Sequence, residues 1–177
     1  MIGTKELLRL VKECKLVDGL CDRELNNPEG SGFDLRVGEV FQIKKGEAFL
    51  GEVDRSTPDV KSIAKYGKEK GIVLKPGDYV LVKTIETVNF PENISAICRP
   101  RTTLQRSGVM LITGATDPGY CGELTFAMCN MGKCDFKLEL GARIVRMLFF
   151  EVSEVVSQYR GQWKGGRVST GGKEKQV

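Results

Sequence analysis

Two short stretches of the chain carry the side chains that could perform chemistry on a ligand. The first covers residues 99–108 and contains three arginines and three hydroxyl side chains within ten positions. Guanidinium groups and hydroxyls donate hydrogen bonds to phosphate oxygens, and the charged donors form the stronger bonds. The stretch therefore favours a polyphosphate ligand, although a solvated basic turn fits its composition equally well. The side chains are those of Arg99, Arg101, Arg106, Thr102, Thr103 and Ser107.

The second stretch, residues 114–126, places an acidic and an aromatic side chain at the start of an expected strand. Asp117 precedes Pro118 and Gly119, and Tyr120 follows them. An aspartate before Pro-Gly is most often a turn former. Because the chain contains no histidine, a carboxylate, lysine, cysteine or tyrosine would have to carry any proton transfer. The residues alone leave Asp117 open between a turn residue and an acid that takes part in chemistry.

Composition limits the class of protein and the class of ligand. Of the 177 residues, 21 are glycine, 41% are hydrophobic and 28% are charged, which predicts a β-rich globular domain with many tight turns. The absence of histidine excludes the Ser-His-Asp and Cys-His nucleophile systems and histidine-ligated zinc sites. A net charge of +4 favours an anionic ligand such as a polyphosphate over DNA or RNA.

Apolar runs and cysteine spacing predict the environment of the protein. No apolar run approaches the ~20 residues that span a bilayer. The six cysteines include no C-x-x-C pair, so free thiols in a reducing compartment are expected. We therefore expect a soluble, cytoplasmic protein that binds neither membrane nor nucleic acid.

The periodicity of apolar residues predicts one N-terminal helix followed by short strands. Leu7, Leu10 and Val11 have helical spacing within residues 4–15, and Thr4 is the expected N-cap. Turn residues separate the later apolar runs, a rhythm typical of an antiparallel sandwich or barrel. The expected strands are residues 33–37, 40–43, 48–53, 72–74, 79–82, 94–98, 109–112, 124–129 and 143–152.

Two segments lack a strand pattern. Residues 54–70 are polar and contain Pro58, so they are expected to form a surface loop. Residues 160–177 hold five glycines and few apolar residues, and such a segment should be mobile unless a ligand orders it. We expect a single domain over residues 1–159 and a flexible, glycine-rich C-terminal arm over residues 160–177.

Five segments, in their order along the chain, resemble the five motifs of the dUTPase and dCTP deaminase superfamily. Each segment alone is a weak signal, but four good matches in family order and at comparable spacings are hard to obtain by chance. The resemblance covers most of the chain. The segments are Ser-Gly-Phe-Asp-Leu at 31–35, Pro-Arg-Thr-Thr-Leu at 100–104, Asp-Pro-Gly-Tyr-Cys-Gly-Glu at 117–123, Asn-Met-Gly at 130–132 with Gly-Ala-Arg-Ile-Val-Arg-Met at 141–147, and Gly-Gly-Arg-Val-Ser-Thr-Gly at 165–171.

The resemblance implies a fold, an assembly and a substrate. The fold would be all-β with one N-terminal helix, a β-clip or distorted jelly roll, assembled as a homotrimer whose active sites are shared between subunits. The substrate would be a deoxynucleoside triphosphate with Mg²⁺ held mainly by its phosphates, so no protein residue is assigned as a metal ligand. In the dUTPase branch the reaction is hydrolysis of dUTP to dUMP and pyrophosphate.

The resemblance also implies roles for individual residues. Asp117 matches the catalytic aspartate, whose carboxylate orients and deprotonates the attacking water. Tyr120 matches the aromatic residue that packs under the deoxyribose and leaves no room for a 2′-hydroxyl. Asp34 and Glu123 match supporting positions. The other residues expected to bind substrate are Arg101, Thr102, Thr103, Arg106, Arg146, Arg167 and Ser169.

One position separates the two activities of the superfamily. Removing the amino group from cytosine requires a proton carrier at the base, and the deaminases resemble one another in placing a glutamate ten positions after the motif aspartate. This chain has Ala127 there, and Glu123 is ~13 Å away along a strand at 3.3 Å per residue. A dUTPase is therefore favoured. A dCTP deaminase, or a bifunctional enzyme that makes dUMP from dCTP, is the alternative, and a non-catalytic nucleotide-binding β-trimer is the second.

Two arginines depart from the family pattern and a third matches one branch of it. Arg146 stands where the fourth motif commonly has glutamine, and Arg167 where the fifth commonly has phenylalanine over the uracil. A guanidinium can stack on a base, as can the nearby Trp163, so a lid over the base is still expected. Arg106 matches an arginine of the deaminase-like branch.

Overall fold

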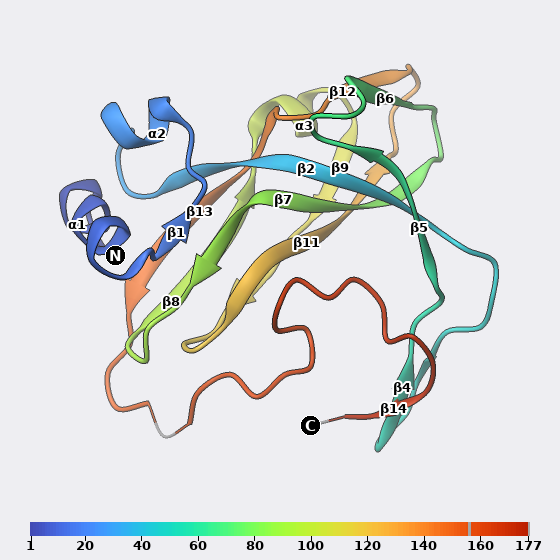
Figure 1. The fold of residues 1–177 in the computed structure, drawn as a ribbon. Helices are drawn as coiled ribbons and strands as arrows, with labels where there is room; N and C mark the ends of the chain where they lie inside the picture. The colour runs from blue at the N-terminus through green and yellow to red at the C-terminus, as the bar shows by residue number, and fades with distance from the viewer. Residues whose placement is uncertain (156, 177) are drawn as a thin grey trace.

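Antiparallel β-strands make up most of the computed structural model, which describes residues 1–155 and 157–176 (Figure 1). The predicted mainly β fold with an N-terminal helix is confirmed, and two further helices of five residues each are present. The helices are α1 (Thr4–Cys14), α2 (Asp22–Asn26) and α3 (Thr102–Arg106). The strands are β1 (Val17–Asp18), β2 (Phe33–Ile43), β3 (Phe49–Leu50), β4 (Asp54–Ser56), β5 (Val60–Lys65), β6 (Gly71–Leu74), β7 (Tyr79–Asn89), β8 (Ile94–Pro100), β9 (Val109–Ile112), β10 (Ala115–Thr116), β11 (Cys121–Asn130), β12 (Phe136–Glu139), β13 (Arg143–Glu151) and β14 (Glu174–Lys175).

One curled sheet of nine strands forms the body of the protein. Its order is β10-β8-β13-β2-β7-β11-β9, with β1 paired to β7 and β5 paired to β2. Two small sheets, β12-β6 and β14-β4-β3, lie outside it. Neighbouring strands are antiparallel throughout these pairings. The long strands β7 and β11 therefore lie side by side in the sheet, and the pocket described below is built on them.

The hydrophobic core is formed by alternate residues of these strands. On β7 and β11 every second side chain is buried, as at Val82, Val88, Phe126 and Met128. The intervening side chains lie on the opposite face of the strands and are half-buried, except for the exposed Tyr79 and Cys121 at the first position of each strand. This second face is available to the C-terminal segment and to a ligand.

Helix α1 closes one end of the core with Leu7, which is fully buried. It ends at Cys14, where Lys15 takes the left-handed conformation of a C-cap (φ 53°). The prediction of Thr4 as N-cap was wrong by one position. Gly3 is the N-cap and Thr4 is the first helical residue.

The predicted surface loop over residues 54–70 was wrong, because it contains β4 and β5. Strand β5 has only Ala64 buried, since it pairs with β2 outside the main path of the sheet and leaves most side chains in solvent. Strand β4 consists of three polar residues that pair with β3 and β14. Neither strand shows the apolar alternation that would predict it.

The predicted break between residues 33–37 and 40–43 is also absent, because β2 is continuous. Its register against β7 shifts between Val37 and Glu39, so the intervening Gly38 sits in an irregularity that bends the strand without ending it. Helices α2 and α3 were missed because a helix of five residues is too short to show a period.

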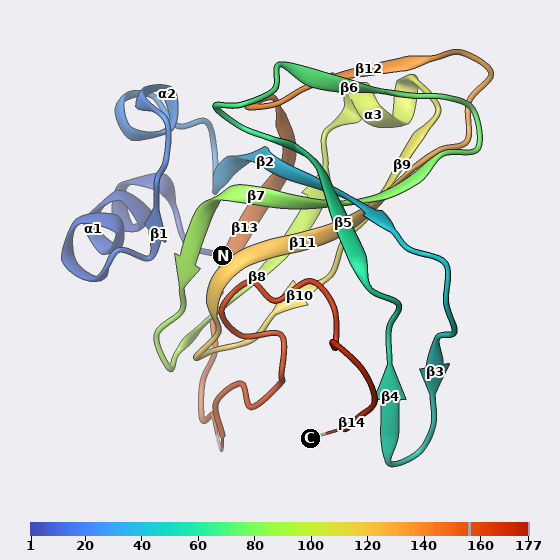
Figure 2. The same cartoon turned by 45° about the vertical axis from the view of Figure 1, so that its right-hand side comes forward.

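The C-terminal segment, residues 157–176, runs beside β7 and β11 and ends against β4 (Figures 1 and 2). In both views it lies at the opposite end of the molecule from α3, β6 and β12. Within the described residues no helix is long and apolar enough to cross a membrane.

Candidate functional site

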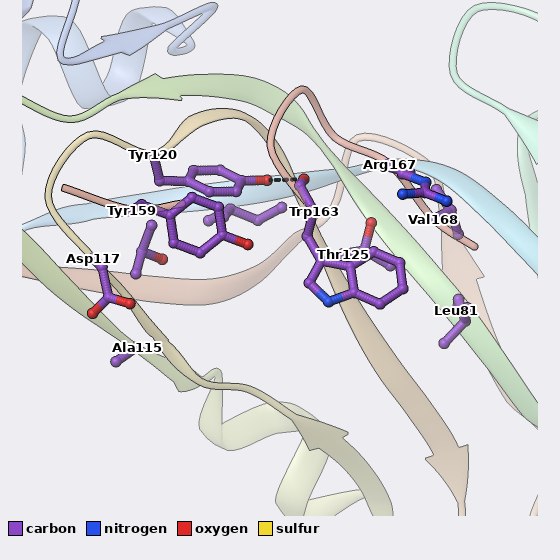
Figure 3. Close-up of a pocket in the computed structure, with 11 residues that line it drawn as sticks. Leu81, Ala115, Asp117, Tyr120, Thr125, Tyr159, Trp163, Arg167 and Val168 are labelled. Carbon is purple, nitrogen blue, oxygen red and sulfur yellow. Dashed lines mark hydrogen bonds between the residues drawn. The ribbon is translucent and has the colours of Figure 1, made fainter. Parts of the chain in front are cut away.

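A pocket of about 340 Å³ lies between β7, β11 and the C-terminal segment. Its volume is within the range of small-molecule sites. Figure 3 shows Asp117 at one end and Leu81 with Arg167 at the other. The lining residues are Leu81, Ala115, Thr116, Asp117, Tyr120, Leu124, Thr125, Tyr159, Trp163, Arg167 and Val168.

Asp117 sits in the turn that leads from β10 into β11. The Tyr120 N–H donates to the Asp117 carbonyl at 3.2 Å, which closes the turn, so the turn-forming role of the Asp-Pro-Gly sequence is real. The Asp117 side chain is nevertheless exposed and lines the pocket. Turn and chemistry are therefore compatible, because the backbone forms the turn and the carboxylate remains free to meet water or a ligand.

Tyr120 forms a fixed aromatic wall of the pocket. Its side chain is 7% exposed, and its ring meets that of Tyr159 edge to face, with 5.2 Å between centroids. Its hydroxyl donates to the Glu123 carbonyl oxygen at 2.8 Å and also lies 3.3 Å from the Trp163 carbonyl oxygen, a second acceptor. Burial raises the pKa of the Tyr120 hydroxyl to about 12, so the phenol stays neutral even well above physiological pH.

The C-terminal segment docks by direct contact of its backbone with the start of β11. The Gly165 N–H donates to the Cys121 carbonyl at 2.6 Å. Gly122 has a φ of +138°, and a Cβ there would clash with the backbone of Gly166 and lie 2.8 Å from the Gly165 carbonyl carbon. Only glycine fits this approach. The glycine pair of the C-terminal segment thus lets it close over the pocket.

Trp163 and Arg167 are held in place by ion pairs and stacking. The guanidinium of Arg55 lies 4.8 Å from the Trp163 ring centroid, and that of Arg167 lies 5.9 Å from it. Glu174 pairs with Arg55 at 2.9 Å and with Arg167 at 2.7 Å. Arg167 also donates to the Ser169 carbonyl at 2.9 Å. The guanidinium of Arg167 is therefore engaged within its own segment while it borders the pocket.

A separate cluster of charges surrounds the buried carboxylate of Asp34 on β2. Asp34 is fully buried and accepts hydrogen bonds from Arg101, from Arg143 at 2.9 Å and from Arg146 at 3.2 Å. The fully buried Glu24 accepts from the Asp34 N–H at 3.0 Å. The arginines come from β13 and from the turn before α3, so Asp34 ties these elements together.

Asp34→Asn is expected to lower the free energy of unfolding by about 3–5 kcal/mol, because it removes the buried carboxylate that the guanidinium groups of Arg101, Arg143 and Arg146 share. Urea denaturation followed by circular dichroism measures this. The control is Asp59→Asn, which removes an exposed pair with Lys44 at 3.9 Å and should change little. An Asp34 variant as stable as the control would contradict a role for this carboxylate in holding the cluster.

The structure brings some of the predicted site residues together and leaves others apart. Asp117, Tyr120 and Arg167 share the pocket, and Glu123 lies beside it, 4.0 Å from Lys83. The rest lie elsewhere. Arg101 and Thr103 line a second pocket of about 280 Å³, Thr102 and Arg106 are exposed on α3, Arg146 belongs to the Asp34 cluster, and Ser169 lies in the C-terminal segment.

Several lining residues were not predicted from the sequence. Thr125 was missed although β11 alternates, and the face that carries Glu123 and Ala127 also carries Thr125. Tyr159 and Leu81 had no local signal, since the first depends on docking of a distant segment and the second on pairing of β7 with β11. Alternation along β11 could have found Thr125 once Asp117 was chosen.

Comparison with known proteins finds a matching family model and similar proteins from other organisms. Residues 1–152 match the dCTP deaminase-like family. The chain is 30% identical over 157 residues to "dCTP deaminase, dUMP-forming" of Dictyoglomus thermophilum, covering 86% of this chain and 81% of that protein. It is 31% identical over 167 residues to the "probable deoxyuridine 5′-triphosphate nucleotidohydrolase" of Methanosarcina mazei, covering 93% of this chain and 96% of that protein.

A solved structure supports the fold. The crystal structure of 2′-deoxycytidine 5′-triphosphate deaminase from Agrobacterium tumefaciens superposes with a TM-score of 0.65 at 15% identity. The match covers 86% of this chain and 48% of that one, so the chain spans about half the length of that deaminase. The expected fold is thereby confirmed.

Proposed function

The chain belongs to the dCTP deaminase-like family, and we propose that within it this enzyme is a dUTP diphosphatase that hydrolyses dUTP to dUMP and pyrophosphate with Mg²⁺. The observation that carries the proposal is the pocket in which the exposed carboxylate of Asp117 and the buried ring of Tyr120 meet. The name of the Methanosarcina relative supports it. The Dictyoglomus relative is named as dUMP-forming, so both names are compatible with dUMP as product.

The chemical step assigns one proton transfer to Asp117. Its carboxylate accepts a proton from a water molecule as the water oxygen attacks the α-phosphorus. The bond from that phosphorus to the bridging oxygen breaks, and pyrophosphate leaves. Tyr120, held by its hydroxyl and by Tyr159, provides a flat surface for the deoxyribose. Its fixed position keeps the sugar, and with it the α-phosphorus, in reach of Asp117.

Mg²⁺ fits this site as a companion of the triphosphate. The described residues contain no group of three or more carboxylate, thiol or imidazole side chains that could hold a metal ion. Mg²⁺ usually keeps several waters and binds through substrate phosphates with few protein ligands. Bound in this way, it supplies positive charge that offsets the charge developing on the phosphates.

The phosphate-binding half of the site is proposed to come from a second copy of the chain. Arg106 and Thr102 are exposed on α3, and α3 lies away from the pocket that holds Asp117. Next to α3, the side chains of Met110 and Ile112 on the edge strand β9 are 46% and 51% exposed. They form an apolar face suited to burial between copies. A homotrimer would place α3 of one subunit beside the pocket of the next.

Ala127 favours hydrolysis of dUTP over deamination of dCTP. In the sheet it lies between Leu81 on β7 and Ile112 on β9, neither of which can carry a proton. The nearest carboxylate on this face is Glu123, two alternate positions back along β11. A cytosine bound beyond Tyr120 would therefore meet no carboxylate at position 127 to shuttle the proton that deamination requires.

Analysis of reaction products tests the proposal. With Mg²⁺, we expect dUTP to give dUMP and pyrophosphate, and dCTP to give no uracil nucleotide, as measured by anion-exchange chromatography. Release of orthophosphate from dUTP, or no turnover, would contradict the diphosphatase activity. Formation of dUMP from dCTP would instead support the bifunctional deaminase, and nucleotide binding without turnover would support a non-catalytic trimer.

A further inference from the structure

A hydroxyl in the wall of the pocket has no hydrogen-bond partner. Among the described residues, Thr125 Oγ1 is the one buried side-chain nitrogen or oxygen atom left unpaired. A buried hydroxyl without a partner costs folding free energy, so native proteins rarely keep one without a reason. Thr125 lines the pocket together with Trp163 and Leu81 (Figure 3). Its hydroxyl is therefore placed where a bound ligand could supply the missing bond.

A buried threonine on the neighbouring strand shows what a structural hydroxyl does in this sheet. Thr84 on β7 is 3% exposed. Its hydroxyl donates to the Glu86 carbonyl at 2.7 Å and accepts from the Leu124 N–H at 3.0 Å. Thr84 thus completes backbone hydrogen bonding within the sheet. The hydroxyl of Thr125, the residue after Leu124, makes no such hydrogen bond.

The position of Thr125 along the pocket indicates which part of a nucleotide it would meet. Asp117 marks the end where the phosphate is cleaved, and the ring of Tyr120 extends along β11 until its hydroxyl reaches the Glu123 carbonyl. Thr125 is the next residue on that face of the strand. The order Asp117, Tyr120, Thr125 therefore follows the order phosphate, sugar, base.

We propose that the Thr125 hydroxyl binds the polar edge of the pyrimidine base, a role that rests on the proposed function of the same pocket. A hydroxyl both donates and accepts, so it can pair with a ring carbonyl or with the ring N–H. Trp163 of the C-terminal segment lines the same pocket as Thr125 (Figure 3). Thr125 anchors the base and does not by itself distinguish uracil from cytosine.

Stability of the ligand-free protein provides the first test. Thr125→Val removes an unpaired hydroxyl at nearly constant shape, so the melting temperature should rise by about 2–4 °C. The matched control, Thr84→Val, removes two hydrogen bonds and should lower the melting temperature by a similar amount or more. A fall in the Thr125 variant comparable to that in the control would show that the hydroxyl is structural and would overturn the proposal.

Binding provides the second test, with two probes measured by calorimetry in the presence of Mg²⁺. We expect Thr125→Val to bind the non-hydrolysable analogue α,β-imido-dUTP about tenfold more weakly than wild type. Thr125→Ser should stay close to wild type. The abasic probe 2-deoxyribose 5-triphosphate should bind wild type and Thr125→Val equally.

The outcomes separate this proposal from the proposed function. Equal affinity of wild type and Thr125→Val for α,β-imido-dUTP would overturn the role of Thr125 alone. If Thr125→Val weakened binding of the abasic probe as much as it weakened binding of α,β-imido-dUTP, the hydroxyl would be assigned to the sugar, and the assignment to the base would be overturned. Failure of the wild-type protein to bind α,β-imido-dUTP would contradict the proposed function and this role together.

Discussion

Asp117→Asn is expected to lower the turnover of dUTP by about 10³-fold while leaving nucleotide affinity nearly unchanged. The amide matches the carboxylate in shape but cannot accept the proton of the attacking water, and general base catalysis contributes roughly 10²–10⁴-fold. The turn should persist, because it is closed by the backbone bond from Tyr120 to the Asp117 carbonyl. Steady-state kinetics and titration with α,β-imido-dUTP separate the two quantities.

The matched control is Asp135→Asn, which alters an exposed aspartate between β11 and β12. It carries the same chemical change away from the pocket and should turn over dUTP at the wild-type rate. A near-normal rate in Asp117→Asn would exclude this carboxylate as the base. A large loss of affinity in that variant would instead assign Asp117 to substrate binding.

The strands could be predicted where apolar residues alternate, and not where polar residues are buried. The prediction for β7 stopped at Val82, but the strand continues to Asn89. The buried positions beyond Val82 include Thr84 and Glu86, which interrupt the apolar pattern. Glu86 is tolerated there because it accepts from the N–H and the side chain of Arg36, at 2.8 and 2.6 Å. Such pairing depends on contacts between distant strands that the sequence does not display.

The candidate site was predictable to the extent that its residues are neighbours in sequence. Asp117 and Tyr120 are three positions apart, and the structure places both in one pocket. Asp34 and Arg146 are separated by 112 positions, and they meet because β2 pairs with β13. No local pattern shows that the arginine at 146 faces a buried carboxylate. Its expected contact with substrate stays a prediction.

The C-terminal segment shows the same limit most clearly. Its glycines predict mobility, but Gly166 also permits close contact with β11 at Gly122. We propose that the docked arrangement of residues 160–176 is the closed state of a flexible arm, which nucleotide stabilises. Amide hydrogen exchange of these residues should then slow when α,β-imido-dUTP is added.

Removing all residues after Gln158 is expected to lower kcat for dUTP by roughly 100-fold and to weaken nucleotide binding much less. Asp117 and Tyr120 remain in the chain, but the truncation deletes Tyr159, which packs against the Tyr120 ring, together with Trp163 and Arg167 from the pocket wall. Water then enters, charge-assisted contacts weaken, and the phosphate is held less accurately, an error that can cost about 10²-fold for 1 Å. Steady-state kinetics of the full and truncated chains measure the effect.

A point variant separates the docking of the C-terminal segment from its side chains. Gly166→Ala keeps every functional group of the segment, but Gly166 has a φ of +71°, and a Cβ there would lie 3.2 Å from the Glu123 backbone nitrogen and clash with the Glu123 carboxylate. If closure accelerates the reaction, Gly166→Ala should lower kcat, as the truncation does. Its affinity for pyrophosphate, the control ligand, should stay unchanged. A truncated chain that hydrolyses dUTP at the full-length rate would show that the segment is an inert extension, because closure over the pocket would then contribute nothing to the chemical step.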